Sequence, residues 1–141
     1  MSKLTELLKE FEGYKRFVYK CSEGHDTVGI GRCIKEGVGA GISEEEAEYL
    51  LEQDLIRVEK ELLDSFDWYE SLDECRKDAL KSMCFQMGLP NLKTFKNALQ
   101  SMADGDFKEA RLHFLESKWA RQTPGRALTT SDMISTGEYP P

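Results

Sequence analysis

The sequence predicts an α+β fold that is mainly helical, with a small glycine-rich β-sheet lobe joined by one long helix to a helical lobe. Three observations predict it. Apolar residues recur at helical spacing over most of the chain, short β-like runs occur only within residues 14–41, and six glycines fall in that stretch. At 141 residues without a linker or repeat, the chain is expected to form one domain, 1–141.

The N-terminal part is expected to hold one helix and the sheet lobe. Leucines and a phenylalanine at helical spacing predict a helix over 2–12, and Gly13 is a plausible stop. The sheet lobe should cover about 13–42, with short strands at 17–19 and 27–30. Its glycines indicate tight turns and close approaches of the backbone.

The long helix is expected over about 43–63. Ser43 and Glu46 have the spacing of a capping box, in which each side chain bonds the other residue's backbone N–H. Beyond them one face is apolar and the other is nearly all charged, as in a helix that lies on a core. The apolar positions are Ala47, Leu50, Leu51, Leu55, Val58 and Leu62.

The helical lobe is expected over about 64–141, together with the N-terminal helix. Ser71 and Glu74 suggest a second capping box that opens a central helix ended by Gly88. Further helices are expected at about 94–103 and 106–116, and Thr123-Pro124 has the pattern of a helix start. Two lobes on one helix would leave a cleft for a ligand between them.

Composition and charge exclude several classes of protein. The net charge is −7, and residues 42–80 hold fourteen acidic against four basic residues, which argues against nucleic-acid binding. No metal site is expected, because the four cysteines and two histidines lack ligand spacing. Cys75 and Cys84 are interpreted as reduced, buried thiols. No apolar run is long enough for a membrane span, and no signal peptide is expected.

Glu12 is a candidate general acid. It lies in the last turn of the first helix, where the partial negative charge of the helix end disfavours an ionised carboxylate. A proton donor at the pH of the reaction needs such an environment. By itself, a surface glutamate at a helix end would be the more ordinary interpretation.

The neighbours of Glu12 change that interpretation. Cys21 follows after nine residues and Thr27 after fifteen, within Glu12-Gly13…Tyr19-Lys20-Cys21…Thr27-Val28-Gly29-Ile30-Gly31. This stretch resembles the phage-type lysozymes (endolysins, glycoside hydrolase family 24), whose signature is Glu, then Asp or Cys, then Thr at this spacing. The resemblance continues in order along nearly the whole chain, through Ile42-Ser43 to Gln53-Asp54, Tyr69 to Asp73, Phe85 to Gly88, Ser117 to Ala127 and Thr136-Gly137.

The resemblance implies a lysozyme-like fold and a muramidase, which hydrolyses the β-1,4 bond between N-acetylmuramic acid and N-acetylglucosamine. Glu12 would protonate the leaving oxygen, while Cys21 and Thr27 would position or activate water, with inversion at the anomeric carbon. Phe85, Gln86 and His113 match positions that face the sugar, although plain packing is an equal alternative for Phe85 and His113. No cofactor is implied.

Three supporting residues follow from the same resemblance. Arg126 matches an arginine that pairs with the catalytic glutamate. Arg32 and Asp54 match a histidine and an aspartate that commonly pair, so we expect them to form an ion pair.

Three departures from the family pattern bear on activity. Cys21 replaces the aspartate of the T-even member, Arg32 stands where a histidine is common, and the stretch between Arg32 and Ile42 is short. They leave a second hypothesis open, a wall-binding or structural module that has lost catalysis.

The resemblance also predicts where the protein acts. Its partner would be bacterial peptidoglycan, and it would be a monomer without stable membrane association. It would stay in the host cytoplasm until lysis and then reach the periplasm and cell wall through a membrane lesion made by a holin.

Overall fold

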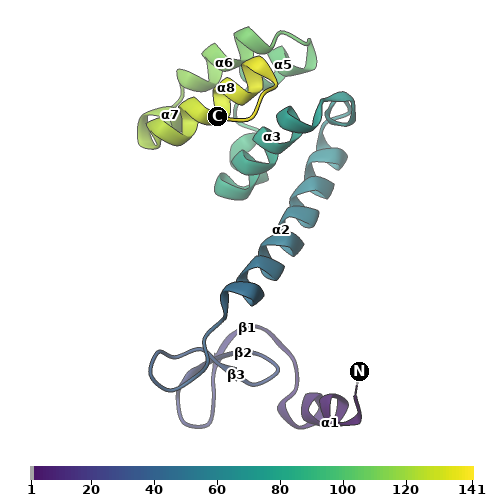
Figure 1. Ribbon diagram of the computed structural model, residues 1–141, viewed down its shortest axis with the longest axis vertical. Coiled ribbons are helices and arrows are strands. Elements are labelled where there is room, and N and C mark those ends of the chain that lie inside the picture. The colour runs from purple at the N-terminus through teal and green to yellow at the C-terminus, as the bar shows by residue number, and fades with distance from the viewer. Residues whose placement is uncertain (1) are drawn as a thin grey trace. The chain divides into compact units, whose positions relative to one another are not determined.

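The computed structural model describes residues 2–141. The chain divides into two compact units, the first ending at Leu51 and the second running from Glu52 to Pro141. Figure 1 labels all the elements except η1 and α4. In chain order they are α1 (Lys3–Glu12), β1 (Lys15–Lys20), β2 (Asp26–Gly29), β3 (Arg32–Cys33), α2 (Glu44–Ser65), the 3-10 turn η1 (Tyr69–Ser71), α3 (Glu74–Met87), α4 (Leu89–Leu92), α5 (Lys96–Ala103), α6 (Phe107–Leu115), α7 (Lys118–Gln122) and α8 (Pro124–Thr136).

The mainly helical α+β fold expected from the sequence is confirmed. The sheet is a three-stranded antiparallel meander in the order β1-β2-β3. Thr27 in β2 pairs with Tyr19 of β1 and with Cys33 of β3. The sequence did not predict β3, because two residues are too few to show an alternating pattern.

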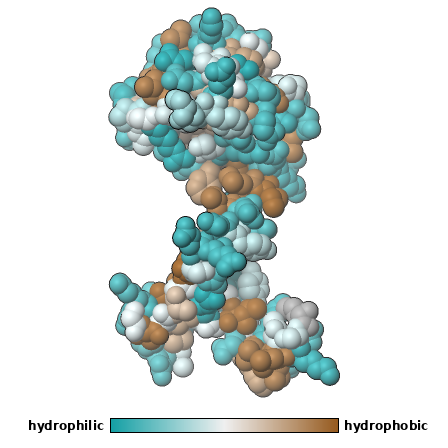
Figure 2. Space-filling view, in the orientation of Figure 1, coloured by the Kyte–Doolittle hydropathy of each residue, from teal (hydrophilic) through white to brown (hydrophobic). Residues whose placement is uncertain are grey.

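The sheet unit has little buried surface. Among residues 2–51, Thr27 is the one buried residue, at 3 % exposure. The apolar face of α1 is exposed and forms a brown patch at the lower right of Figure 2; it consists of Leu4, Leu7, Leu8 and Phe11. Side-chain polar contacts and turns therefore contribute much of the order of this unit.

The capping boxes expected at the two main helices had different outcomes. At α2 the box is formed: Ser43 N donates to Glu46 Oε1 at 2.9 Å, and Glu46 N donates to Ser43 Oγ at 3.1 Å. At α3 the expected Ser71–Glu74 box is wrong. Asp73 is the N-cap and accepts from Arg76 N at 3.2 Å, since Ser71 is already used in η1 and donates to Trp68 O.

The second unit holds the hydrophobic core. The central helix α3 contributes Ala79, Leu80, Met83 and Cys84, all at most 2 % exposed. Aromatic side chains pack around them, and Phe95, Phe114 and Trp119 form a set of tilted and edge-to-face pairs with centroids 5.5–6.3 Å apart. Such packing holds in place the helices that carry the candidate residues Phe85, Gln86, His113 and Arg126.

Candidate functional site

Glu12 ends α1 and lies against the turn between β2 and β3. Gly13 closes the helix with φ +71°, and its N–H donates to Lys9 O at 2.8 Å. A Cβ added at Gly31 would lie 2.7 Å from Glu12 Oε2 and 2.9 Å from Glu12 Cδ. The carboxyl group therefore occupies the space that a side chain at Gly31 would take.

Cys21 and Thr27 come together at the end of the β1–β2 hairpin. Cys21 follows the last residue of β1, and its N–H donates to His25 O at 3.0 Å, which closes the loop. Thr27 lies in β2, and its hydroxyl donates to the same carbonyl of His25 at 2.9 Å. Since a hydroxyl has one proton, this bond leaves the lone pairs of Thr27 Oγ1 free to accept from another group.

The loop between Cys21 and His25 also sets the acidity of the thiol. The backbone N–H of His25, followed in importance by that of Glu23, hydrogen-bonds the sulfur and lowers the pKa of Cys21. Cys21 is partly exposed and free. Backbone N–H groups favour a thiolate because they place partial positive charge on the sulfur.

Arg32 forms an ion pair with a residue that the sequence did not suggest. Its guanidinium donates to both carboxylate oxygens of Glu46, with Nη1 and Nη2 at 3.0 and 2.7 Å, and Nη1 also donates to Gly41 O at 2.8 Å. This contact and the Ser43 cap lower the pKa of Glu46 to about 2. Asp54 pairs with Arg57 at 2.9 Å. The expected Arg32–Asp54 pair would join the two units and stays a prediction.

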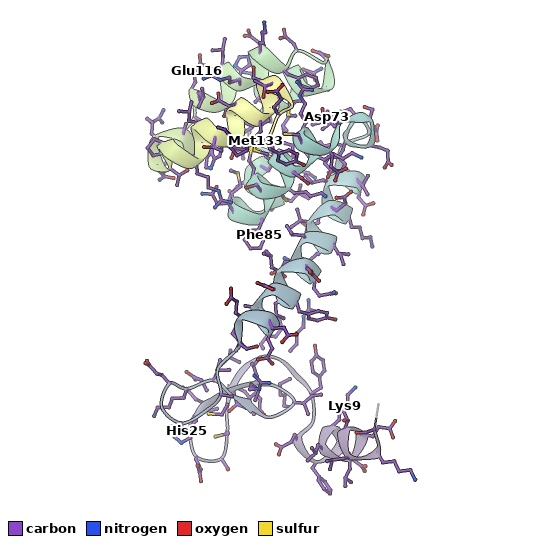
Figure 3. The ribbon with its side chains drawn as sticks, viewed as in Figure 1. Lys9, His25, Asp73, Phe85, Glu116 and Met133 are labelled. Carbon is purple, nitrogen blue, oxygen red and sulfur yellow. The ribbon has the colours of Figure 1, made fainter. Side chains whose placement is uncertain are left out.

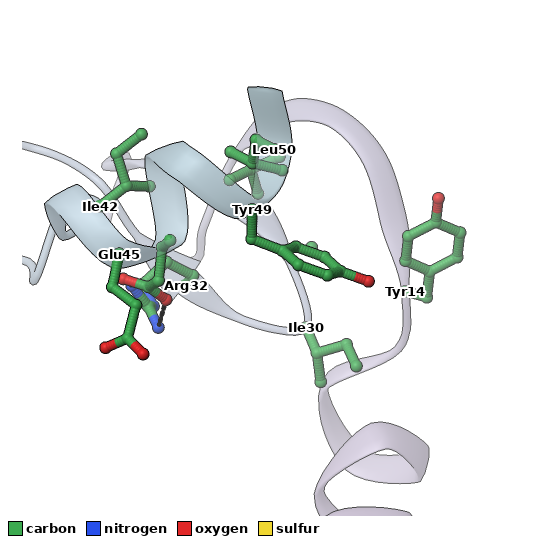
Figure 4. Close-up of a pocket in the computed structure, with 10 residues that line it drawn as sticks. Tyr14, Ile30, Arg32, Ile42, Glu45, Tyr49 and Leu50 are labelled. Atoms are coloured by element: carbon green, nitrogen blue, oxygen red, sulfur yellow. Dashed lines mark hydrogen bonds and ion pairs between the residues drawn. The ribbon is translucent and has the colours of Figure 1, made fainter. Parts of the chain in front are cut away.

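A groove of about 850 Å³ lies in the sheet unit, between the β2–β3 turn and the first turns of α2. Figure 4 shows Tyr14 and Tyr49 on its walls, with Ile30 near its edge and Arg32 beside the helix. Glu46, the partner of Arg32, also lines the groove. The sequence analysis did not single out either tyrosine, since neither belongs to a recognisable motif.

Gln86 is held by a tryptophan in the second unit. Trp119 Nε1 donates to Gln86 Oε1 at 2.9 Å, and because an indole nitrogen only donates, the amide oxygen of Gln86 must face it. The amide N–H groups are then free for a ligand. Both residues line a hollow of about 560 Å³ that also includes Lys118. Sequence reasoning missed Trp119 as a partner, although it lies in one of the matched segments.

The other candidates of the second unit, Phe85, His113 and Arg126, do not line the hollow beside Gln86. Phe85 projects from α3 and is 46 % exposed (Figure 3). His113 borders a hollow of about 220 Å³ and lies 3.3 Å from Glu109. Arg126 donates to the backbone oxygen of Ser82 at 3.1 Å and to its hydroxyl at 3.2 Å. Pairing of Arg126 with Glu12, and sugar contacts of Phe85 and His113, stay predictions.

Cys75 and Cys84 are buried and free, in agreement with their interpretation as packing residues. Burial raises the pKa of both thiols, to about 11 for Cys84, where Glu61 adds to the effect. In the described part of the chain, no group of His, Cys, Asp and Glu side chains is arranged to hold a metal ion. No helix among residues 2–141 has the length and apolar character to span a membrane.

Comparisons with known proteins agree on one family. The family profile described as phage lysozyme matches residues 9–130. The chain is 32 % identical to a probable T4-type lysozyme of Dictyostelium discoideum, over 97 % of this chain and 96 % of the relative. It is 30 % identical to a peptidoglycan hydrolase of Pseudomonas phage phiKMV, over 85 % of this chain but 14 % of the relative. It is 29 % identical to an endolysin of Acyrthosiphon pisum secondary endosymbiont phage 1, over 82 % of this chain and 75 % of the relative.

The family profile covers most of the chain, including Glu12, Cys21 and Thr27. The chain therefore belongs to the phage lysozyme family.

Proposed function

We propose that the protein is a muramidase that hydrolyses the β-1,4 bond between N-acetylmuramic acid and N-acetylglucosamine in peptidoglycan. The observation that carries the proposal is that three groups with suitable chemistry lie on or against one small sheet. A carboxyl group lies at the β2–β3 turn, and a thiol of lowered pKa lies beside a buried hydroxyl at the β1–β2 end. The family and the names of its members support the same substrate.

Glu12 is assigned the role of general acid. Breaking the glycosidic bond leaves negative charge on the departing oxygen, and a carboxylic acid that donates its proton there removes that charge. The transition state resembles an oxocarbenium ion, so the carboxylate that remains also stabilises the positive charge on the sugar.

Thr27 and Cys21 are assigned to the attacking water. The Thr27 hydroxyl donates its hydrogen bond to His25 O, so Oγ1 would accept a hydrogen bond from the water and leave a water lone pair free to attack the anomeric carbon. The Cys21 thiolate would take up the proton that the water loses. Attack from the side opposite the leaving group gives inversion.

The central test is replacement of the general acid. Glu12→Gln should lower the rate of wall hydrolysis by about 10²–10⁴, the usual contribution of a positioned acid. The measurement is loss of turbidity of permeabilised Gram-negative cells, and Glu10→Gln, an exposed carboxylate on the same helix, is the matched control. Activity of Glu12→Gln within threefold of wild type would remove Glu12 from the mechanism.

Inversion is tested on a soluble glycan fragment. Proton NMR should show the α-anomer as the first product, which then equilibrates, whereas a retaining enzyme would release the β-anomer first. Cleavage in a host would also require passage to the wall, which we assign to a membrane lesion made by a holin.

A wall-binding module without catalysis is the competing proposal. It is favoured by one observation, that position 21 carries a thiol and not a second carboxylate. Such a module would sediment with purified peptidoglycan and release no new reducing ends, and Glu12→Gln would bind as wild type does.

A further inference from the structure

Two glycines, Gly29 at the end of β2 and Gly31 in the turn that follows it, share a backbone conformation but differ in their surroundings. Gly29 has φ +70° and Gly31 has φ +71°, both in the left-handed region that side-chain-bearing residues rarely adopt. A Cβ at Gly29 would meet no atom within 4 Å. A Cβ at Gly31 would lie 2.7 Å from Glu12 Oε2, 2.9 Å from Glu12 Cδ and 3.1 Å from Glu12 Cγ.

We propose that Gly31 is a positioning residue for the reaction. Because Gly31 has no side chain, it leaves a space, here called the seat, that the carboxyl group of Glu12 occupies. The inference rests on the proposed function, since it gives a role to Gly31 only through Glu12. Backbone strain favours glycine at both positions, but of the two only Gly31 has the close contact with Glu12.

The seat connects Glu12 to the other two candidate groups. Gly31 belongs to the turn that directly follows β2, the strand of Thr27, and the paired residues Val28 and Arg32 flank that turn. Cys21 lies in the β1–β2 loop, at the opposite end of the same strand. The position of the acid relative to the water-binding groups is therefore set by the sheet as well as by α1.

An added methyl group should displace the acid without destroying the fold. Contacts below 3.0 Å between a Cβ and another heavy atom do not persist, so one of the two must move. The atoms met are the end of a flexible side chain, and Glu12 is exposed, so it turns to another rotamer. A displacement of about 1 Å of a reacting group is enough to reduce turnover by about 10²-fold.

The experiment compares Gly31→Ala with Gly29→Ala in the full chain. Both variants should lose thermal stability to a similar extent, because both place alanine at a positive φ. Only Gly31→Ala should lose turnover, by about 10²-fold with little change in KM. Equal loss of turnover in the two variants would overturn the proposal and assign the effect to strain.

Coupling to Glu12 provides a second readout. In a Glu12→Gln background, Gly31→Ala should cause no further loss of activity, whereas two independent effects would multiply. If Gly31→Ala alone does not fold, the double variant with Glu12→Ala should fold, because the group that the methyl meets is gone. Failure of that double variant to fold would also overturn the proposal.

The carboxyl carbon of Glu12 gives a readout that does not depend on activity. Its 13C chemical shift should change in Gly31→Ala and stay the same in Gly29→Ala. If wild type fails to cleave peptidoglycan, the proposed function is wrong, and this comparison still decides whether Gly31 seats Glu12. If wild type is active and Glu12→Gln is not, an unchanged shift in Gly31→Ala refutes the seat alone.

Discussion

Cys21 is the residue at which the active and the inactive interpretations of this protein differ most. At acidic pH a thiol is less available as a base than a carboxylic acid, because its higher pKa keeps it protonated. The N–H groups of His25 and Glu23 lower the pKa of Cys21 and so extend the range in which it is ionised. Catalysis that needs a protonated Glu12 and an ionised Cys21 should show a narrow, bell-shaped pH profile.

Substitutions of Cys21 should therefore change the pH profile. On the acidic side, activity is lost as the pH falls through the lowered pKa of the thiol and the thiolate becomes protonated. Cys21→Asp should extend activity to lower pH, and Cys21→Ser should reduce turnover by about 10²-fold or more. The measurement is the pH dependence of hydrolysis, with Cys33→Ser as the control. A normal rate and profile in both Cys21→Ser and Cys21→Ala would reduce Cys21 to a small residue that leaves room for water.

At the scale of elements, the N-terminus of α2 depends on an ionised carboxylate. Glu46 accepts from Arg32 and from Ser43 N, and its pKa is lowered to about 2. A lowered pKa in the folded state stabilises the fold above the unfolded pKa of about 4.3, and this stability is lost as the pH falls toward about 2.

Glu46→Gln should accordingly lower the thermal midpoint at pH 7 and have a smaller effect near pH 2, where Glu46 is losing its charge in wild type as well. Glu45→Gln, on the same turn and exposed, is the control and should change the midpoint little. A double-mutant cycle between Arg32→Met and Glu46→Gln should show coupling. The same cycle with Asp54→Asn tests the separate prediction of an Arg32–Asp54 pair.

The elements also indicate what a sequence can predict. Long periodic segments and the Ser43–Glu46 box gave the longer helices and the start of α2 correctly, whereas the short helices α4 and α7 were not predicted. A capping pattern was less informative where two nearby residues could both serve as the N-cap. Ser71 was predicted to cap α3, but Asp73 is the N-cap. The pairing of Arg32 with Glu46 was missed because partners fourteen residues apart depend on how the loop after β3 folds back.

The candidate site was predictable in part only. Periodicity and composition did not single out Glu12, Cys21 or Thr27, which came from the spacing of the family signature. The signature does not predict the packing of Glu12 against Gly31 or the hydrogen bond from Thr27 to His25 O. In both contacts the partner of the side chain is backbone, which a pattern of side-chain types does not specify. Close backbone approaches were expected from the glycines as a group, but their partners depend on tertiary structure.

At the scale of the whole molecule, stability should be distributed unevenly. The described part of the first unit buries Thr27 alone, whereas the second unit contains the core cluster. Amide protons of Thr27 and Val28 should exchange faster with deuterium than those of Leu80 and Met83, by about 10-fold or more, because sub-global opening requires less apolar surface to be exposed. Equal protection of the two groups in NMR exchange at neutral pH would contradict this prediction.

The order of the three strands has a consequence for the synthesis of the protein. Neighbours in the sheet are also neighbours in sequence, so each pairing closes a short loop at a small cost in chain entropy. Residues 12–31 contain every group assigned to bond cleavage and its seat, while Val58 is the first residue of the core cluster. The nascent chain therefore contains the groups assigned to the proposed reaction before it contains any residue of that core, and early sheet pairings would have to form from local contacts alone.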